Sequence, residues 1–219
     1  MPDCAIHLVV GLGNPGAPYE DTRHNVGYMA VEAFLAEQEG AAHASPSPRG
    51  QKRAKAGGSF ISSLFSGKKA SYSKVRCEAV VHELDFEGSR IVVAKPQTFM
   101  NLSGRSVKGL LKHYGLAIDE ALVVHDDLDL PAATLRIKTG GGHGGHNGLR
   151  NIIASCGEGF TRLKIGIGRP PGHMPAERFV LQQLRGEALE ELKADANRAA
   201  DAAADILRNG VLAAQNKYN

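Results

Sequence analysis

Apolar residues along the chain follow two spacings, and each spacing predicts one kind of element. Short runs of branched apolar residues are typical of buried strands, whereas apolar residues that recur every three or four positions are typical of helices. The expected strands cover residues 6–10, 75–84, 91–95, 122–125, 134–138 and 163–167. The expected helices cover residues 25–39, 102–114, 149–155 and 187–209, with a further short helix starting at Pro175.

Strands and helices alternate along most of the chain, and this order predicts an α/β fold. The sequence Asp-Phe-Glu-Gly at residues 85–88 is typical of a hairpin turn, so the strands on either side of it are expected to pair antiparallel. Strands separated by helices are expected to pair in parallel. We therefore predict one α/β sandwich domain over residues 1–219, with a twisted, mostly parallel mixed central sheet flanked by helices.

Composition narrows the class of protein. With 219 residues, 42% of them hydrophobic and 22% charged, the chain is long enough for a substantial core. No apolar run approaches the roughly 18 residues of a membrane span, and the first residues do not read as a secretion signal. Cys4, Cys77 and Cys156 are far apart and lack the spacing of metal ligands, so they are expected to be reduced thiols of a cytoplasmic protein.

Charge is distributed unevenly along the chain. Eight basic residues and no acidic ones lie between Glu39 and Glu78, although the net charge of the whole chain is only +3. Residues 40–59 are also rich in Ala, Ser, Pro, Gly and Lys, which bury little apolar surface. We expect a basic, flexible insert at about residues 40–74. It is either a contact for a polyanion such as nucleic acid or a solvated passenger.

A glycine-rich loop, Gly-Leu-Gly-Asn-Pro-Gly at residues 11–16, follows the first strand. Its three glycines match the G-x-G-x-x-G pattern of dinucleotide sites, but in that pattern the third glycine opens a helix. Here Pro15 interrupts the loop and the expected helix starts several residues later. A plain turn explains the glycines, but it does not explain Asn14 or the Thr-Arg-His-Asn cluster at residues 22–25.

Polar residues also follow other predicted strands. If the sheet is mostly parallel, these strand ends meet at one rim, where open α/β sheets bind ligands. A carboxylate that orients an imidazole makes the imidazole a base for water, and amides stabilise an oxyanion. The sequence therefore predicts a hydrolase site without an obvious covalent nucleophile. Its expected members are Asn14, His24, Asn101, Asp126, His146 and Asn147.

A metal site is the competing interpretation of the same region. Residues 125–127 (His-Asp-Asp) and the pair His143 and His146 are ligand types for a divalent ion. However, the two histidines lie in a loop of glycines, with no helix to fix their spacing.

The motifs are collinear with those of the bacterial-type peptidyl-tRNA hydrolase family, which the chain resembles over about residues 5–210. The motifs that carry the resemblance are residues 11–16 with Tyr19, 22–27, 99–104 (Phe-Met-Asn-Leu-Ser-Gly), 125–131 (His-Asp-Asp-Leu-Asp-Leu-Pro), 140–148 and 162–168. The resemblance implies hydrolysis of the ester that joins a peptide to the 3′ end of tRNA, with no metal or other cofactor. It also implies peptidyl-tRNA as the partner, no membrane or stable protein partner, and a cytoplasmic monomer.

The resemblance also implies roles for residues. His24 would be the general base, Asp126 its orienting carboxylate, and Asn14 would help to distinguish a blocked amine from a free aminoacyl group. The groove for the peptidyl-adenosine end would be lined by Tyr19, Phe99, Asn101 and Asn147, and aromatic rings suit a single-stranded end. Three cations are candidates for phosphate contacts, or equally for solvated charges at the edge of a strand: Lys138, Arg162 and Lys164.

The chain departs from the family pattern in two places. The segment at residues 40–74 is longer and more basic than expected, and Lys164 stands where an arginine is expected in many members. A second function on the same scaffold stays open. RNA-binding factors of the intron-splicing type resemble this family and can retain its catalytic residues, so His24 and Asp126 alone do not exclude that function.

Overall fold

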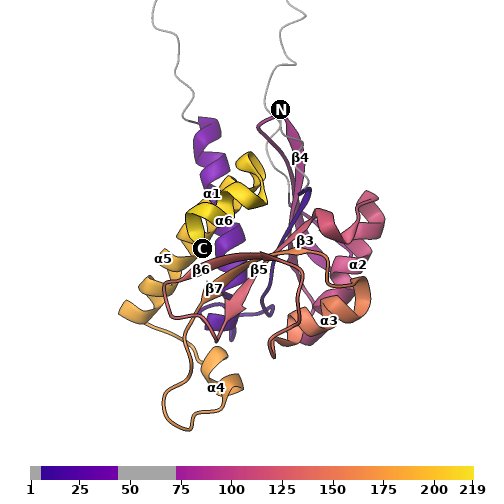
Figure 1. Cartoon of the computed structure of the whole chain (residues 1–219). Helices are drawn as coiled ribbons and strands as arrows, with labels where there is room; N and C mark the ends of the chain where they lie inside the picture. Colours follow the sequence, from indigo (N-terminus) through magenta and orange to yellow (C-terminus); the bar gives the residue numbers. More distant parts are fainter. Residues whose placement is uncertain (1–5, 44–72) are drawn as a thin grey trace, which may run out of the picture.

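The computed structural model describes residues 6–43 and 73–219, and its centre is a seven-stranded sheet (Figure 1). The strands lie in the order β2-β3-β4-β1-β5-β7-β6. Their bounds are β1 Leu8–Gly11, β2 Ser73–Arg76, β3 Ala79–Phe86, β4 Ser89–Pro96, β5 Ala121–Asp127, β6 Leu135–Thr139 and β7 Thr161–Gly166.

Strand direction confirms the predicted mixed sheet. The four central strands, β4, β1, β5 and β7, pair in parallel. The hairpin of β3 and β4 is antiparallel, as the turn at residues 85–88 predicts, and β2 extends it in the same manner. At the opposite edge β6 pairs antiparallel with β7. The carboxyl ends of the parallel strands therefore meet at one rim.

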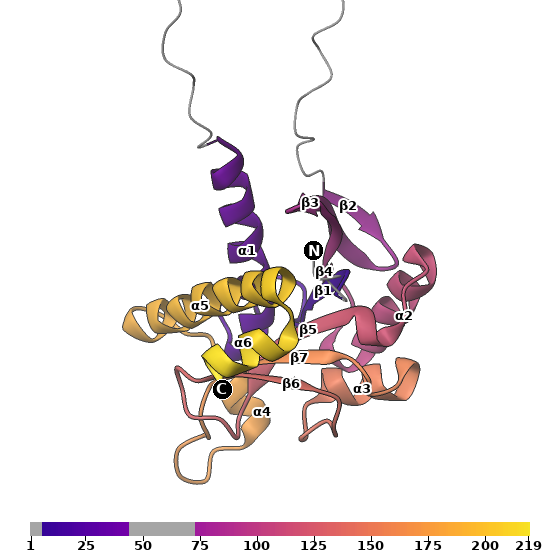
Figure 2. The ribbon, with the colours of Figure 1, turned by 45° about the horizontal axis from the view of Figure 1, so that its top comes forward.

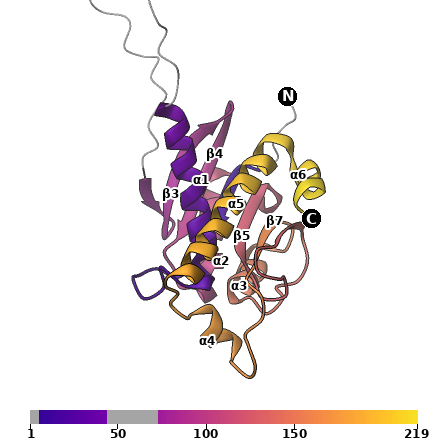
Figure 3. The ribbon, with the colours of Figure 1, turned by 90° about the vertical axis from the view of Figure 1, so that its left-hand side faces the viewer.

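Helices cover both faces of the sheet (Figures 2 and 3). The helices are α1 Val26–His43, α2 Ser103–Tyr114, α3 Asn147–Cys156, α4 Ala176–Val180, α5 Glu187–Asn209 and α6 Val211–Tyr218. Helices α1 and α5 lie side by side over one face, and α2 and α3 cover the other. None of the helices in the described residues is long and apolar enough to cross a membrane.

Alternation along the central strands explains the two layers. In β1, Val9 faces the core under α1 and α5, whereas Leu8 and Val10 face the core under α2 and α3. In β5, Leu122 and Val123 divide in the same way. Successive side chains of a strand point to opposite faces, so a run that is apolar at every position is buried on both sides.

Two details differ from the sequence-based prediction. The predicted strand over residues 75–84 is two strands, because Cys77 and Glu78 both have positive φ and form the tight turn between β2 and β3. Neither residue type favours that conformation, so the sequence carried no turn signal. The prediction also lacked α6. Helix α5 ends at Asn209, and α6 begins directly after Gly210.

Most of the predicted basic insert at residues 40–74 lies outside the described residues. Helix α1 runs on to His43, four residues past the predicted end, and β2 begins at Ser73.

A close approach of backbones joins α1 to the sheet. A Cβ atom on Gly27 would lie 2.4 Å from the Val124 carbonyl oxygen and 2.6 Å from that of Leu12. A Cβ atom on Gly11 would lie 2.3 Å from the Gly27 carbonyl oxygen. Only glycine permits these contacts, so the first turn of α1 rests directly on β1 and β5. This places residues just before Gly27 beside the end of β5.

Replacing Gly27 tests this contact. We expect Gly27→Ala to lower the free energy of unfolding by about 1–3 kcal/mol or more, because the added methyl group meets two carbonyl oxygens and backbone must move. Gly159→Ala is the matched control, because its methyl group would lie 3.6 Å from Ile118, an ordinary contact. Urea denaturation of both variants measures the difference. Equal stability of the two would contradict the close approach.

Candidate active site

A cleft of about 610 Å³ opens at the carboxyl ends of the parallel strands, where the sequence predicts a site. Residues from four separate parts of the chain line it, which confirms that the strand ends converge. The predicted site residues on its wall are Asn14, His24, Phe99, Asn101, Asp126, Asn147, Arg162 and Lys164.

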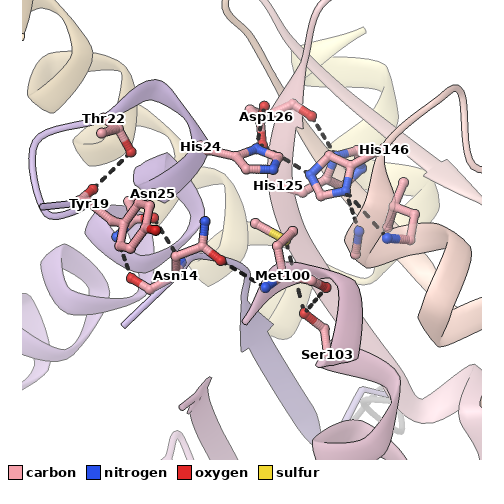
Figure 4. Close-up of polar contacts among 12 residues, drawn as sticks. Asn14, Tyr19, Thr22, His24, Asn25, Met100, Ser103, His125, Asp126 and His146 are labelled. Carbon is pink, nitrogen blue, oxygen red and sulfur yellow. Dashed lines mark hydrogen bonds and ion pairs between the residues drawn. The ribbon is translucent and has the colours of Figure 1, made fainter. Parts of the chain in front are cut away.

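His24 lies in a short 3₁₀ turn, Arg23–Asn25, that leads into α1. Its Nδ1 atom is 3.0 Å from both carboxylate oxygens of Asp126, which ends the buried part of β5 (Figure 4). The side chains are buried, with 9% of His24 and 3% of Asp126 exposed. The contact follows from the glycine packing described above, because His24 precedes Gly27 by three residues and Asp126 follows Val124 by two.

His146, which the sequence analysis expects at this rim without giving it a chemical role, is a third member of this cluster. Its Nε2 atom is 3.0 Å from Asp126 Oδ1. Its Nδ1 atom accepts hydrogen bonds from the backbone N–H groups of Gly148 and Leu149, so His146 is the N-cap of α3 (Figure 4). The helix was predicted to begin at residue 149, whereas α3 begins at Asn147, so the sequence did not indicate this capping role.

These hydrogen bonds fix which ring nitrogen carries the proton. Because His146 Nδ1 accepts from two N–H groups, its ring proton lies on Nε2 and is donated to Asp126. The Asp126 carboxylate only accepts, so His24 donates to it from Nδ1. His24 Nε2 then keeps its lone pair and is available as a base. One carboxylate thus holds two imidazoles in opposite tautomers.

The electrostatics of the pair support this arrangement. Burial alone would lower the pKa of His24, but the charge of Asp126 and the hydrogen bond to it prevail and raise that pKa above the ordinary value. Burial alone would raise the pKa of Asp126, but the charges and hydrogen bonds of His24 and His146 bring it well below its ordinary value. Asp126 is therefore ionised throughout the physiological range.

His125 supports the cluster from the neighbouring position of β5. Its Nδ1 atom donates to the Asp126 carbonyl oxygen at 2.7 Å, and its ring meets the His146 ring edge-on at 5.0 Å. Full burial, together with the nearby His146, lowers the pKa of His125 to about 3, so this ring is neutral. It packs against His146 and does not exchange protons near neutral pH.

Asn14 is held so that its side chain offers only donors to the cleft. Its backbone N–H donates to Asn25 Oδ1 at 2.8 Å, and its carbonyl oxygen accepts from Asn25 Nδ2 at 2.9 Å. The Asn14 Oδ1 atom accepts from the Met100 backbone N–H at 2.7 Å. The amide nitrogen Nδ2 has no hydrogen-bond partner in the described part of the chain. It is therefore free to donate to a ligand.

Of the two predicted aromatic residues, Phe99 lies on the cleft wall, and Tyr19 contacts Phe99 without lining the cleft itself. The Tyr19 and Phe99 rings meet edge to face with centroids 6.3 Å apart, and Phe99 is 54% exposed. Asn101 and Asn147 are exposed on the cleft wall, and Asn147 Oδ1 accepts a hydrogen bond from Arg150. An exposed ring beside exposed amides is suited to stacking and hydrogen bonding with a base.

The three predicted phosphate-binding cations differ in their surroundings. Lys138 is exposed on the edge strand β6. Lys164 lies on the cleft wall, where it forms an ion pair with Asp127 at 2.6 Å. Arg162, expected near the rim, is only 1% exposed and lies beneath the glycine-rich loop, bonded to the Gly141 and Gly142 carbonyl oxygens. For all three, a contact with tRNA phosphates stays a prediction.

The glycine-rich loop reaches the site by a route that the sequence did not predict. Because β6 is antiparallel to β7, its end at Thr139 lies beside Thr161, at the start of β7. Asp126 lies beside Ile165, four residues further along. Four residues of a strand span about 13 Å, at roughly 3.3 Å per residue. The loop after Thr139 must therefore run back over this distance along β7 to bring His146 to the carboxylate.

The cluster of His24, Asp126 and His146 also meets the simplest requirements for a metal site. Among the described residues it is the group whose ligand atoms all lie within 4.8 Å of one another. Its nitrogen–oxygen contacts are hydrogen bonds of 3.0 Å, and both imidazole nitrogens that face Asp126 carry protons. A zinc ligand needs a bare nitrogen at about 2.0–2.1 Å from the ion. His143 and Asp127 are engaged elsewhere, with Gly145 and Lys164.

The G-x-G-x-x-G pattern does not have the geometry of a dinucleotide site. Helix α1 begins at Val26, well after Gly16, so the third glycine does not open a helix. Gly11 serves the contact with Gly27, and Gly13 packs on the Tyr28 ring.

Known proteins share this fold and sequence along nearly the whole chain. A model of the peptidyl-tRNA hydrolase family matches residues 8–219. The peptidyl-tRNA hydrolase of Rhodococcus opacus is 41% identical over 213 residues, covering 97% of each chain. That of Pseudarthrobacter chlorophenolicus is 39% identical over 213 residues, covering 97% of this chain and 94% of the relative.

A solved structure gives the same result. The crystal structure of peptidyl-tRNA hydrolase from Acinetobacter baumannii superimposes with a TM-score of 0.77 at 32% identity, covering 99% of this chain and 95% of that one. The expected α/β sandwich and the expected resemblance are both confirmed. The chain therefore belongs to the peptidyl-tRNA hydrolase family, and its activity is the hydrolysis of peptidyl-tRNA.

Proposed function

We propose that His24 is the general base of this hydrolysis and that Asp126 and His146 determine which of its ring nitrogens carries the proton. The observation that carries the proposal is the pair of imidazoles on one buried carboxylate, which leaves a free lone pair on Nε2 of His24, a residue that lines the cleft. His24 takes a proton from water as the water oxygen attacks the ester carbonyl carbon. The bond to the ribose oxygen then breaks, and His24 returns the proton to that oxygen.

Asn14 is proposed to select for a blocked amine. Its Oδ1 atom is already used by the Met100 N–H group, so only Nδ2–H donors face the substrate. The first peptide carbonyl of a peptidyl group is an acceptor and pairs with such a donor. The free ammonium group of an aminoacyl-tRNA is itself a donor, so it gains no partner there. Aminoacyl-tRNA is then disfavoured relative to peptidyl-tRNA, because its ammonium group and the Asn14 amide are both donors and leave each other unpaired.

The remaining predicted residues are proposed to hold the 3′ end of tRNA. Tyr19 and Phe99 offer ring faces and edges to the terminal base, while Asn101 and Asn147 offer amides along the cleft. Lys138 and Lys164 are proposed to meet phosphates, with Lys164 exchanging part of its pairing with Asp127. Because the substrate is produced by translation, we propose a cytoplasmic enzyme. A monomer, which the resemblance implies, is also proposed.

An RNA-binding factor without catalysis is not favoured. The family model and the relatives are those of hydrolases.

Replacing His24 tests the base. We expect His24→Ala to lower kcat by at least about 10²–10⁴-fold, the usual contribution of a general base, and to leave tRNA affinity within a few fold. Release of peptide from N-acetyl-aminoacyl-tRNA measures kcat. His173→Ala, at an exposed position, is the matched control and should keep normal activity. Near-normal turnover by His24→Ala would refute the assignment.

The pH profile of Asp126→Asn tests the carboxylate. The unprotonated form of His24 is active, so activity of the natural enzyme should fall as pH drops through a pKa above about 6.5. The amide introduced in place of Asp126 lacks the charge that raises this pKa, while burial, which lowers it, remains. The acid limb of kcat/KM should therefore move to lower pH.

The maximum kcat/KM of Asp126→Asn, reached above the acid limb, should also fall by about 10²–10⁴-fold. An amide that accepts from His146 through its oxygen presents N–H to His24, which forces the proton onto Nε2 and removes the base. A pH profile with an unmoved acid limb would contradict the role of Asp126.

A further inference from the structure

The glycine-rich loop at residues 140–146 is held by hydrogen bonds mainly at its two ends. Gly140 N–H donates to the Phe160 carbonyl oxygen, and the N–H groups of Gly145 and His146 donate to His143. Gly140, Gly141, Gly144 and Gly145 all have positive φ, and glycines bring no side chains to pack. The loop also spans the roughly 13 Å return from the start of β7 to Asp126 without helix or strand. Yet it ends in His146, whose ring must lie at hydrogen-bond distance from Asp126. The middle of the loop, at Gly141 and Gly142, is held by a side chain from outside the loop.

Arg162 provides that support from β7. It is the largest of the side chains that are less than 2% exposed, and its two terminal nitrogens donate to the consecutive carbonyl oxygens of Gly141 and Gly142. Its guanidinium group also stacks on the Phe160 ring, 4.6 Å from the centroid. The flat, forked guanidinium group suits two neighbouring acceptors in a way that a lysine ammonium group does not.

The burial of this charge needs an explanation beyond stability. In the described residues no carboxylate forms an ion pair with Arg162, and its Nε atom has no hydrogen-bond partner. Burial lowers the pKa of Arg162, an effect that the charge of Glu158 only opposes. Taking a charge out of water costs several kcal/mol, and even buried ion pairs can often be replaced by apolar side chains of similar volume without loss of stability. The fold itself therefore gains little from an arginine here, whereas the loop gains two anchors.

We propose that Arg162 is a positioning residue for catalysis: it fixes the glycine-rich loop on the sheet and so holds His146 against Asp126. The inference rests on the proposed roles of His24 and Asp126, since His146 acts through them. It assigns Arg162 a task other than the contact with tRNA phosphates considered from the sequence. Both terminal nitrogens of the fork already have acceptors, and its 1% exposure leaves little surface for a phosphate.

Two substitutions separate these roles. Arg162→Met keeps much of the volume and removes the charge, and the freed carbonyl oxygen of the exposed Gly142 becomes accessible to water. We expect this variant to remain folded, with urea stability close to that of the natural protein. Arg162→Lys keeps the charge without the fork. Arg136→Met, on the exposed face of the neighbouring strand β6, is the matched control for the loss of one positive charge.

The expected result is a defect in kcat. Displacement of a positioned group by about 1 Å typically costs on the order of 10²-fold, so kcat should fall about 10–100-fold in both Arg162→Met and Arg162→Lys, with KM within about twofold. Backbone amides of residues 140–148 should exchange hydrogen faster in both variants. Arg136→Met should retain its kcat and its loop protection.

The pH profile gives a readout that a structural role alone would not move. If His146 leaves Asp126, the carboxylate interacts more strongly with His24 alone, which favours the imidazolium form. The acid limb of kcat/KM should then move to higher pH in Arg162→Met, opposite to its direction in Asp126→Asn.

Three results would overturn the proposal. Full activity of Arg162→Lys, with a salt dependence of binding that is weaker by about one unit of slope in Arg162→Met, would indicate a phosphate contact. Unchanged loop exchange in both variants would mean that Arg162 does not hold the loop. Faster exchange with unchanged kcat would mean that the loop does not matter for catalysis. Failure of the proposed function is distinguished from these results, because it appears as retained turnover in His24→Ala with Arg162 intact.

Discussion

A buried carboxylate is costly unless its oxygens receive hydrogen bonds, and the structure around Asp126 supplies them from two directions. His24 and His146 each donate one ring N–H at 3.0 Å. Because both rings direct a proton to the same carboxylate, the tautomer of His24 is set by Asp126 and not by solvent. In the proposed mechanism, the bare nitrogen that results activates the nucleophilic water of the hydrolysis.

The rest of the fold can be understood as the means of delivering these groups to one point. Gly11 and Gly27 let α1 rest on the sheet so closely that His24 lies beside the end of β5. On the other side of the carboxylate, His146 is fixed by the N-terminus of α3, which it caps, and by the loop that Arg162 anchors. Asn14 is fixed in turn by Asn25, the neighbour of His24. The proposed base and the Asn14 amide are therefore positioned by the same short segment, residues 23–25.

The sequence predicted the sheet, its two helical layers and most of the cleft, because apolar spacing and strand-end polar residues depend on local pattern. It did not predict the reversal of β6, since pairing direction at an edge depends on tertiary contacts. Because of that reversal, His146 reaches the carboxylate only through a loop that runs back along β7. Arg162 of β7 is buried beneath this loop and is not exposed at the rim. The turn at Cys77 and Glu78 escaped prediction because neither residue type signals positive φ. Which nitrogen carries a proton required the geometry of Asp126.

The tautomers of His24 and His146 are therefore the most direct test of this mechanism. Nitrogen NMR of the uniformly ¹⁵N-labelled enzyme at a pH above the His24 pKa distinguishes a protonated ring nitrogen from a bare one. We predict opposite states in one spectrum: His24 protonated at Nδ1 and bare at Nε2, and His146 protonated at Nε2 and bare at Nδ1. Assignment of both rings rests on the spectra of His24→Ala and His146→Ala. A proton on Nε2 of His24 would contradict its role as the base.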